Sequence, residues 1–165
     1  MLDSIADLLG SLRTGEPATT SASGGLRLRS TVAPPASTEE IDRAWAGRRT
    51  PPLLRELWRA ARSADLFVDV DYGQWGLRLF GPPRSKEETD RVRQGRPSDF
   101  GEGDVVIGEF LGDSDLLVVE RDGVVRVAWP LDPRADWPTV ANDLSAFLLR
   151  YRDTEGAKYW EHPVE

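Results

Sequence analysis

The fold is decided by residues 105–129, which read VVIGEFLGDSDLLVVERDGVVRVAW. Three short apolar runs, 105–111, 116–120 and 124–129, are separated by polar segments that contain glycine and aspartate. Short runs rich in Val, Ile, Leu and Phe predict strands, and Gly/Asp segments between them predict tight turns. These residues therefore predict a three-stranded antiparallel meander.

The rest of the chain adds more strands and several helices. A second hairpin is predicted over 66–71 and 75–80, because Gly73 can adopt the backbone of a tight turn. Apolar spacings of three and four predict helices over 2–12, 37–45, 51–62 and 137–151, with a short strand over 26–32 and a solvated helix over 85–94. Because the strands come in runs, the chain is predicted to be an α+β domain, with a largely antiparallel or mixed sheet packed by N-terminal and C-terminal helices.

The 165 residues suffice for one domain with its own core. Residues 1–25 are predicted as an amphipathic helix plus a flexible link that belong to the same domain, 26–152 as the α+β domain, and 153–165 as a tail. Two capping boxes are predicted at helix starts, one from Ser37 to Glu40 and one from Ser85 to Glu88.

Composition excludes several classes of function. The chain has 28 acidic and 21 basic residues, a net charge of −7, which disfavours binding to nucleic acid or to an anionic membrane. It has no cysteine and a single histidine, His162, so thiol catalysis and multi-histidine metal sites are excluded. Acids in the first residues and the lack of a long apolar run lead us to expect a cytoplasmic protein.

Short motifs with chemical meaning fail on their spacing. The 112–115 segment, Gly-Asp-Ser-Asp, lacks the second glycine of a nucleophile elbow and the later ligands of an EF-hand loop. The glycines Gly101 and Gly103 precede a strand and lie beside acids, unlike a phosphate-binding loop. We therefore expect no catalytic residue, no metal and no cofactor.

Acidic residues are concentrated between Asp99 and Asp122. This segment has eight acids and one base, Arg121, so it accounts for the whole net charge of −7. A solvated loop edge is one interpretation, and an acidic face on one edge of the meander that steers a basic partner is the other. The candidate contacts are Glu102, Asp104, Asp113 and Asp115, with Trp129 or Trp137 as an aromatic anchor.

The order of these segments resembles the SUKH superfamily (Smi/Knr type). The resemblance covers the capped run 34–41, the proline-started run 51–58, the meander 108–129 and the closing 144–148. The chain differs from that pattern at 60–65, which lacks an Asn-Gly turn, and has Thr50-Pro51 where Leu-Pro is usual. The resemblance implies a SUKH-like α+β fold for the domain at 26–152 and binding without catalysis. Bacterial members are largely cytoplasmic immunity proteins that block a cognate toxin, and fungal members are scaffolds in cell-wall signalling.

Three functions follow as hypotheses. The first is an immunity protein that neutralises a cognate toxin, such as a basic nuclease, by stoichiometric binding. The second is a regulatory scaffold for an endogenous protein, with the first helix docking elsewhere through a mobile link at 14–25. The third is a hydrolase that uses two carboxylates on adjacent strands, Glu109 and Glu120.

Overall fold

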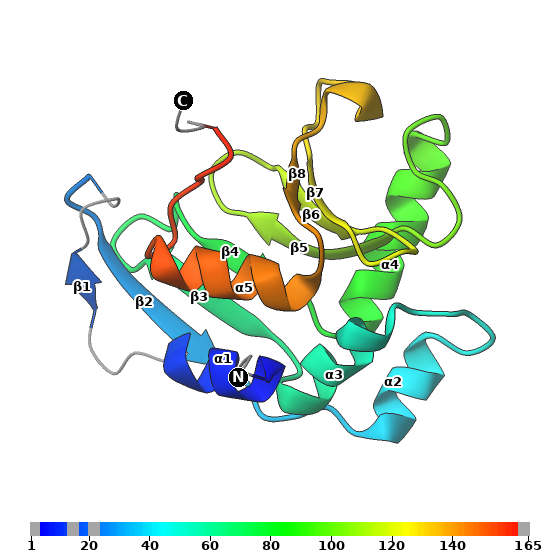
Figure 1. Cartoon of the computed structure of the whole chain (residues 1–165), viewed down its shortest axis with the longest axis horizontal. Helices are drawn as coiled ribbons and strands as arrows, with labels where there is room; N and C mark the ends of the chain where they lie inside the picture. The colour runs from blue at the N-terminus through cyan, green and yellow to red at the C-terminus, as the bar shows by residue number, and fades with distance from the viewer. Residues whose placement is uncertain (1–3, 13–16, 20–23, 162–165) are drawn as a thin grey trace.

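The strands form one antiparallel sheet in which each strand pairs with its neighbours in sequence (Figure 1). A computed structural model describes residues 4–12, 17–19 and 24–161. The strands are β1 (Ala18–Thr19), β2 (Arg27–Val32), β3 (Ala64–Asp69), β4 (Leu77–Leu79), β5 (Val105–Phe110), β6 (Leu116–Val119), β7 (Val125–Ala128) and β8 (Thr139–Ala141). The predicted α+β class, the hairpin and the meander are confirmed, and the described sheet is antiparallel throughout.

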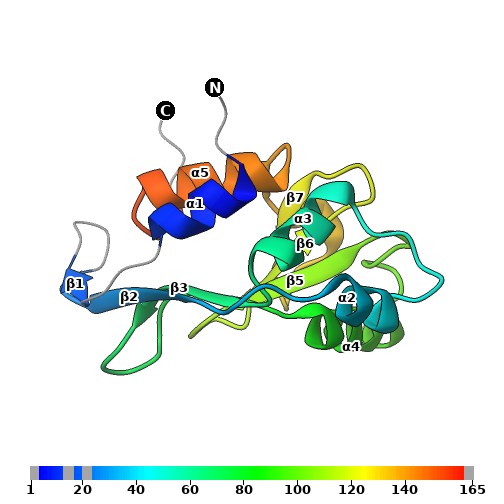
Figure 2. The ribbon, with the colours of Figure 1, turned by 90° about the horizontal axis from the view of Figure 1, so that it is seen from below.

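Helices cover both faces of this sheet (Figure 2). They are α1 (Ile5–Leu12), α2 (Thr38–Ala44), α3 (Pro52–Ala60), α4 (Pro82–Gly95) and α5 (Leu144–Asp153), with a 3-10 turn at Arg134–Asp136. The main core lies under α1, α3 and α5, and a second core lies between α4 and the opposite face. Among the described residues, no helix combines the length and the apolar character required to span a membrane.

The first helix belongs to the main core. Ile5, Leu8, Leu9 and Leu12 are all buried, and α1 packs against α3 and α5. The residue spacing predicted this apolar face, and the structure shows that α3 and α5 cover it. Ala18 and Thr19, within the segment predicted as a flexible link, pair with Leu28 and Arg27 as β1, whereas 13–16 and 20–23 lie outside the described residues.

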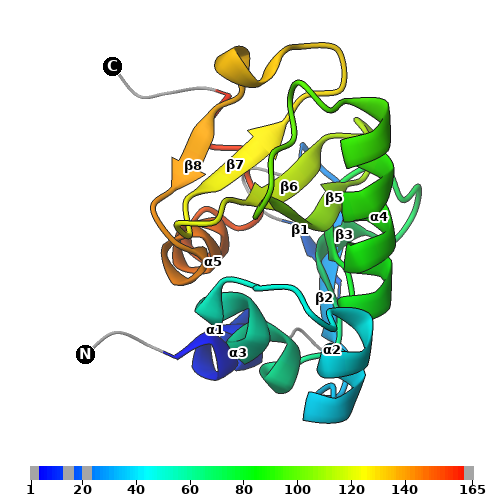
Figure 3. The ribbon, with the colours of Figure 1, turned by 90° about the vertical axis from the view of Figure 1, so that its right-hand side faces the viewer.

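Helix α4 lies against β5 (Figure 3), and two small hydroxyl side chains connect the two elements. Ser85 Oγ donates to the Val106 carbonyl at 2.6 Å, and Thr89 Oγ1 accepts from the Val106 amide at 3.0 Å. The register of β5 and β6 shifts directly after Val106, which explains why its backbone groups need partners outside the ladder. The predicted capping box at Ser85 is wrong, since the helix begins at Pro82 and Ser85 is buried inside it.

Two other helix starts differ in detail from prediction. Ser37 caps α2 by accepting from the Glu40 amide, but the Glu40 carboxylate binds the Arg62 guanidinium instead of returning to the cap. The closing helix does not start near Trp137, because residues 139–141 form β8. Asp143 then caps α5 by accepting from the Ala146 amide at 2.8 Å.

Candidate functional site

The acidic segment is divided between two ends of the meander. In the β5–β6 ladder Val105 lies opposite Val119, and Glu109 lies opposite Leu116. Residues just before β5 and just after β6 therefore lie at one end, whereas the β5–β6 turn with Asp113 and Asp115 lies at the other. Five strand steps separate the ends by about 17 Å. The expectation of one continuous acidic edge is corrected, because strand reversal places the acids in two groups.

At the first end, Asp104 is neutralised inside the protein. It is 4% exposed, and its carboxylate receives two bonds from the Arg134 guanidinium at 2.6 and 3.2 Å and one from the Gly101 amide at 2.7 Å. Glu120 also accepts from Arg134 and from Arg126, each at 2.6 Å. A carboxylate bound in this way cannot reach a partner, so Asp104 is a structural residue of this end.

Arg134 links this network to the loop before β5. Its backbone amide donates to Asp99 Oδ1 at 3.1 Å, and its guanidinium donates to the Asp99 carbonyl at 2.8 Å. The bond from the Arg134 amide and the Arg96 guanidinium lower the pKa of Asp99, while the Asp104 and Glu120 carboxylates raise the pKa of Arg134. These contacts therefore favour the charged forms of Asp99 and Arg134, which stabilises the network.

The network fixes the β7–β8 loop (residues 129–138). Arg96 donates to the carbonyls of Trp129 at 3.1 Å and Asp132 at 2.6 Å, and Trp137 Nε1 donates to the same Asp132 carbonyl at 3.0 Å. Leu131, between these anchors, is 95% exposed. The loop therefore exposes a large apolar side chain to solvent, and hydrogen bonds hold the backbone on both sides of that residue.

Neither predicted aromatic anchor is a free surface group. Trp137 is 3% exposed and packs on Phe100 in the second core, and Trp129 is half-buried against both cores. Sequence analysis missed Leu131, although its position in Pro130-Leu131-Asp132-Pro133 is a usable signal. A leucine confined to a proline-bounded turn has no helix or strand to bury it.

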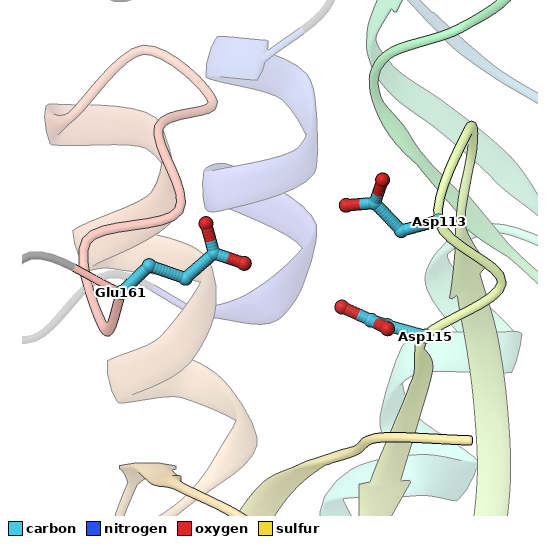
Figure 4. Close-up of side chains that lie close together, drawn as sticks. All are labelled: Asp113, Asp115 and Glu161. Carbon is cyan, nitrogen blue, oxygen red and sulfur yellow. The ribbon is translucent and has the colours of Figure 1, made fainter. Parts of the chain in front are cut away.

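At the second end, three carboxylates lie close together, and two of them contact a lysine. Oxygens of Asp113, Asp115 and Glu161 lie within 4.8 Å of one another (Figure 4). Their spacing could hold a metal ion. However, the Lys158 ammonium forms an ion pair with Asp113 and lies 3.9 Å from Asp115, so an internal cation already offsets this charge.

This cluster docks the C-terminal segment on the sheet. The Lys158 ammonium lies 5.3 Å from the Trp75 ring centre and 5.5 Å from the Phe110 ring centre, and Tyr159 Oη donates to the Val140 carbonyl at 2.6 Å. Asp113 is exposed but engaged by Lys158, and Asp115 is buried. Docking of the tail as far as Glu161 agrees with its aromatic content, and His162 lies outside the described residues.

Asp115 gives a pH dependence that can be measured. Burial raises its pKa, with Asp113 and Glu161 adding to the effect and Lys158 opposing it. The folded state therefore holds this proton more tightly than the unfolded state, and the stabilisation is complete below the unfolded pKa and lost as pH rises through the folded pKa. We expect Asp115→Asn, which cannot ionise, to gain free energy of unfolding relative to the wild type as the pH rises above the unfolded aspartate pKa of about 3.9. Urea unfolding at several pH values measures this difference.

Asp90→Asn is the matched control for that experiment. The Lys86 ammonium and then Arg48 lower the pKa of Asp90, so its stabilisation is present above the unfolded pKa and lost as pH falls. The control should show the opposite trend. A difference between Asp115→Asn and the wild type that stays constant with pH would contradict the expectation.

The two carboxylates proposed for hydrolysis do not form a pair. Glu109 lies opposite Leu116 at the start of β6, whereas Glu120 follows its end, four strand steps or about 13 Å away along β6. Paired carboxylates in glycoside hydrolases lie roughly 5–10 Å apart. Arg84 binds Glu109 at 3.3 Å, and two arginines bind Glu120. These glutamates therefore support the sheet surface and do not create a two-carboxylate centre.

No protein-family model and no curated protein matches this chain.

Proposed function

We propose that this chain is a non-catalytic protein-binding domain that acts as an immunity protein, blocking a cognate toxin by stoichiometric binding. The partner contacts the β7–β8 loop, with Leu131 as the central apolar contact. The observation that carries the proposal is the exposed leucine on a loop whose backbone is held by Arg96, Arg134 and Trp137.

A fixed loop favours binding because it has little freedom left to lose. Ordering an interface loop opposes association, and a loop already held by hydrogen bonds avoids most of that loss. Burying a leucine from near-complete exposure removes apolar area from water, worth about 1.5–3 kcal/mol. The β7–β8 loop thus has the two properties required of a small binding epitope.

Acidic residues contribute to this proposal at fewer positions than the sequence suggested. Glu102 and Asp122 are exposed, and Asp136 is exposed on the β7–β8 loop itself. They can speed association with a basic partner such as a nuclease, because long-range attraction acts before contact. Asp104 and Asp115 are buried and are not contacts in the proposal.

The β7–β8 loop supports binding to a protein, and the resemblance to the SUKH superfamily is the reason for proposing that this protein is a toxin. The competing scaffold hypothesis relied on a first helix free to dock elsewhere, and α1 is instead buried against α3 and α5. A scaffold that uses the β7–β8 loop would still differ from an immunity protein in the identity of its partner, which the following experiment determines.

The substitution Leu131→Asp tests the binding surface. We expect capture of the partner, from cells that naturally make this protein, to weaken by about 10- to 100-fold. Tyr72→Asp is the control, since Tyr72 is the other large apolar side chain that is exposed among the described residues, at 73%, and lies in the β3–β4 turn. Affinity is measured by titrating the identified partner against each immobilised variant.

The captured protein is then identified and tested for toxicity. A toxin inhibited at equimolar wild-type chain supports the immunity function. Recovery of housekeeping proteins alone supports the scaffold. Equal affinity of Leu131→Asp and the wild type for the partner would exclude the β7–β8 loop as the contact.

A further inference from the structure

A cleft lies between the α2–α3 connection, the C-terminal end of α4 and the loop before β5. Its volume is about 750 Å³, within the roughly 300–1,000 Å³ typical of small-molecule sites. Trp45, Pro51, Pro52 and Val105 give it apolar walls. The cleft therefore has room for a ligand with both an organic part and a charged group.

Four arginines line this cleft: Arg48, Arg49, Arg93 and Arg121. Arg48 forms an ion pair with Asp90 at 3.0 Å. The other three have no carboxylate partner among the described residues. This separates them from Arg62, Arg78, Arg96, Arg126 and Arg134, each of which binds a carboxylate elsewhere in the protein.

The acids near the cleft leave this positive charge unbalanced. Asp104 lines the cleft, but its carboxylate is taken by Arg134. Glu102 is exposed at the rim and is the other carboxylate that lines the cleft. Although the protein has a net charge of −7, guanidinium groups without a carboxylate partner among the described residues therefore lie together in this cleft.

Two buried polar atoms in the wall of the same cleft lack a hydrogen-bond partner among the described residues. They are Thr50 Oγ1 and Arg93 Nε. The one hydrogen bond that the Arg93 side chain makes in the described structure is long, 3.5 Å from Nη2 to the Asp104 carbonyl. Buried donors without acceptors are unfavourable, so an acceptor that reaches this wall would be stabilised.

The position of Arg121 depends on a glycine. Gly103 has a φ of +88°, and a Cβ at this residue would lie 2.7 Å from Arg121 Cβ. The stem of Arg121 therefore lies directly against the loop before β5, beside the cleft that Arg121 lines. Gly103 is thus required both for the turn and for the close approach of a cleft arginine.

We propose that this cleft binds a small phosphate-bearing molecule, with a diphosphate group held by Arg49, Arg93 and Arg121. Guanidinium groups bind phosphate oxygens through paired, charge-assisted hydrogen bonds, and three of them match a multiply charged anion. A long nucleic acid fits less well, because the negative charge of the remaining surface would repel its backbone. The proposal is independent of the partner at the β7–β8 loop.

Titration calorimetry with inorganic pyrophosphate and with ADP tests the site on the full chain. We expect saturable binding of both at concentrations below about 10 mM. The double variant Arg49→Ala/Arg121→Ala should weaken the affinity at least about tenfold. Glu102→Gln should strengthen it by about twofold, because it removes a nearby negative charge. The control is Arg29→Ala/Arg59→Ala, which removes two exposed arginines that do not line the cleft.

Each outcome has a defined meaning. Tighter binding of ADP than of pyrophosphate supports a nucleotide as the source of the phosphate, and equal binding supports free diphosphate. NMR shift changes at Thr50, Arg93 and Gly103 support the location. The proposal is overturned by an absence of saturable binding to either probe, or by equal losses in the cleft variant and the control.

Discussion

Replacing Arg134 with alanine is expected to lower the free energy of unfolding by about 3 kcal/mol, within the range for breaking a buried ion pair. The loss arises because Asp104 remains buried with the Gly101 amide as its one remaining donor, while Glu120 keeps Arg126. Partial exposure of Arg134 places the value at the lower end of that range. Urea unfolding followed by tryptophan fluorescence measures it.

A double-mutant cycle separates the ion pair from general damage. Arg134→Ala combined with Asp104→Asn removes both charges, so the double variant should lose less than the sum of the two single variants. Arg91→Ala is the surface control, because Arg91 is well exposed and pairs with Glu88 on the same helix, and it should cost under about 1 kcal/mol. A loss for Arg134→Ala no larger than that of the control would contradict the network.

Arg134→Ala also tests the link between the network and the β7–β8 loop. Without this side chain, the loop loses its bonds to the Asp99 carbonyl and to Asp104. Amide exchange in residues 129–138 should then become faster in the still folded protein, which would identify Arg134 as the residue that holds Leu131 in place.

Trp58→Ala is expected to destabilise the protein by about 3–5 kcal/mol. Trp58 is fully buried, its Nε1 donates to the Phe80 carbonyl at 3.0 Å, and its ring stacks on Trp45 with 5.9 Å between centres. The substitution therefore leaves a large cavity between α3 and the sheet and an unpaired carbonyl. Calorimetric unfolding measures the loss.

The variant Trp58→Phe separates the effect of the cavity from the effect of the lost hydrogen bond. It retains most of the ring volume and removes the Phe80 hydrogen bond, so it should lose about 1–3 kcal/mol. Equal losses for the alanine and phenylalanine variants would mean that the cavity contributes nothing, which is contrary to the packing observed.

Local pattern was sufficient to predict the central strands of the sheet. The alternation and polar turns of residues 105–129 depend on near neighbours, and β5, β6 and β7 lie where the sequence places them. The start of α4 and the short strand β8 were not predicted. For α4, the reason is a contact with a strand outside its own segment. Ser85 and Thr89 have the side chains of a helix cap but bind Val106, which no local pattern reveals.

The candidate site was less predictable because charge along a chain does not show how charges pair in space. Asp104 and Asp115 belong to an acidic segment, yet their cations are Arg134 and Lys158, which are 30 and 43 residues away. The same limit applies to the arginine cleft, since Arg49, Arg93 and Arg121 are brought together by three separate segments. Only Leu131, between two prolines, had a local signal.

The packing of α1 against α5 has a consequence during protein synthesis. The sheet can be built strand by strand as the chain leaves the ribosome, because each strand pairs with a neighbour in sequence. Helix α1 emerges long before α5 but packs on it, and Ser11 bonds to Arg152, 141 residues later. An incomplete chain that ends before α5 therefore leaves Ile5, Leu8, Leu9 and Leu12 without part of their cover. Such a chain would offer chaperones and proteases an apolar helix that the finished protein conceals.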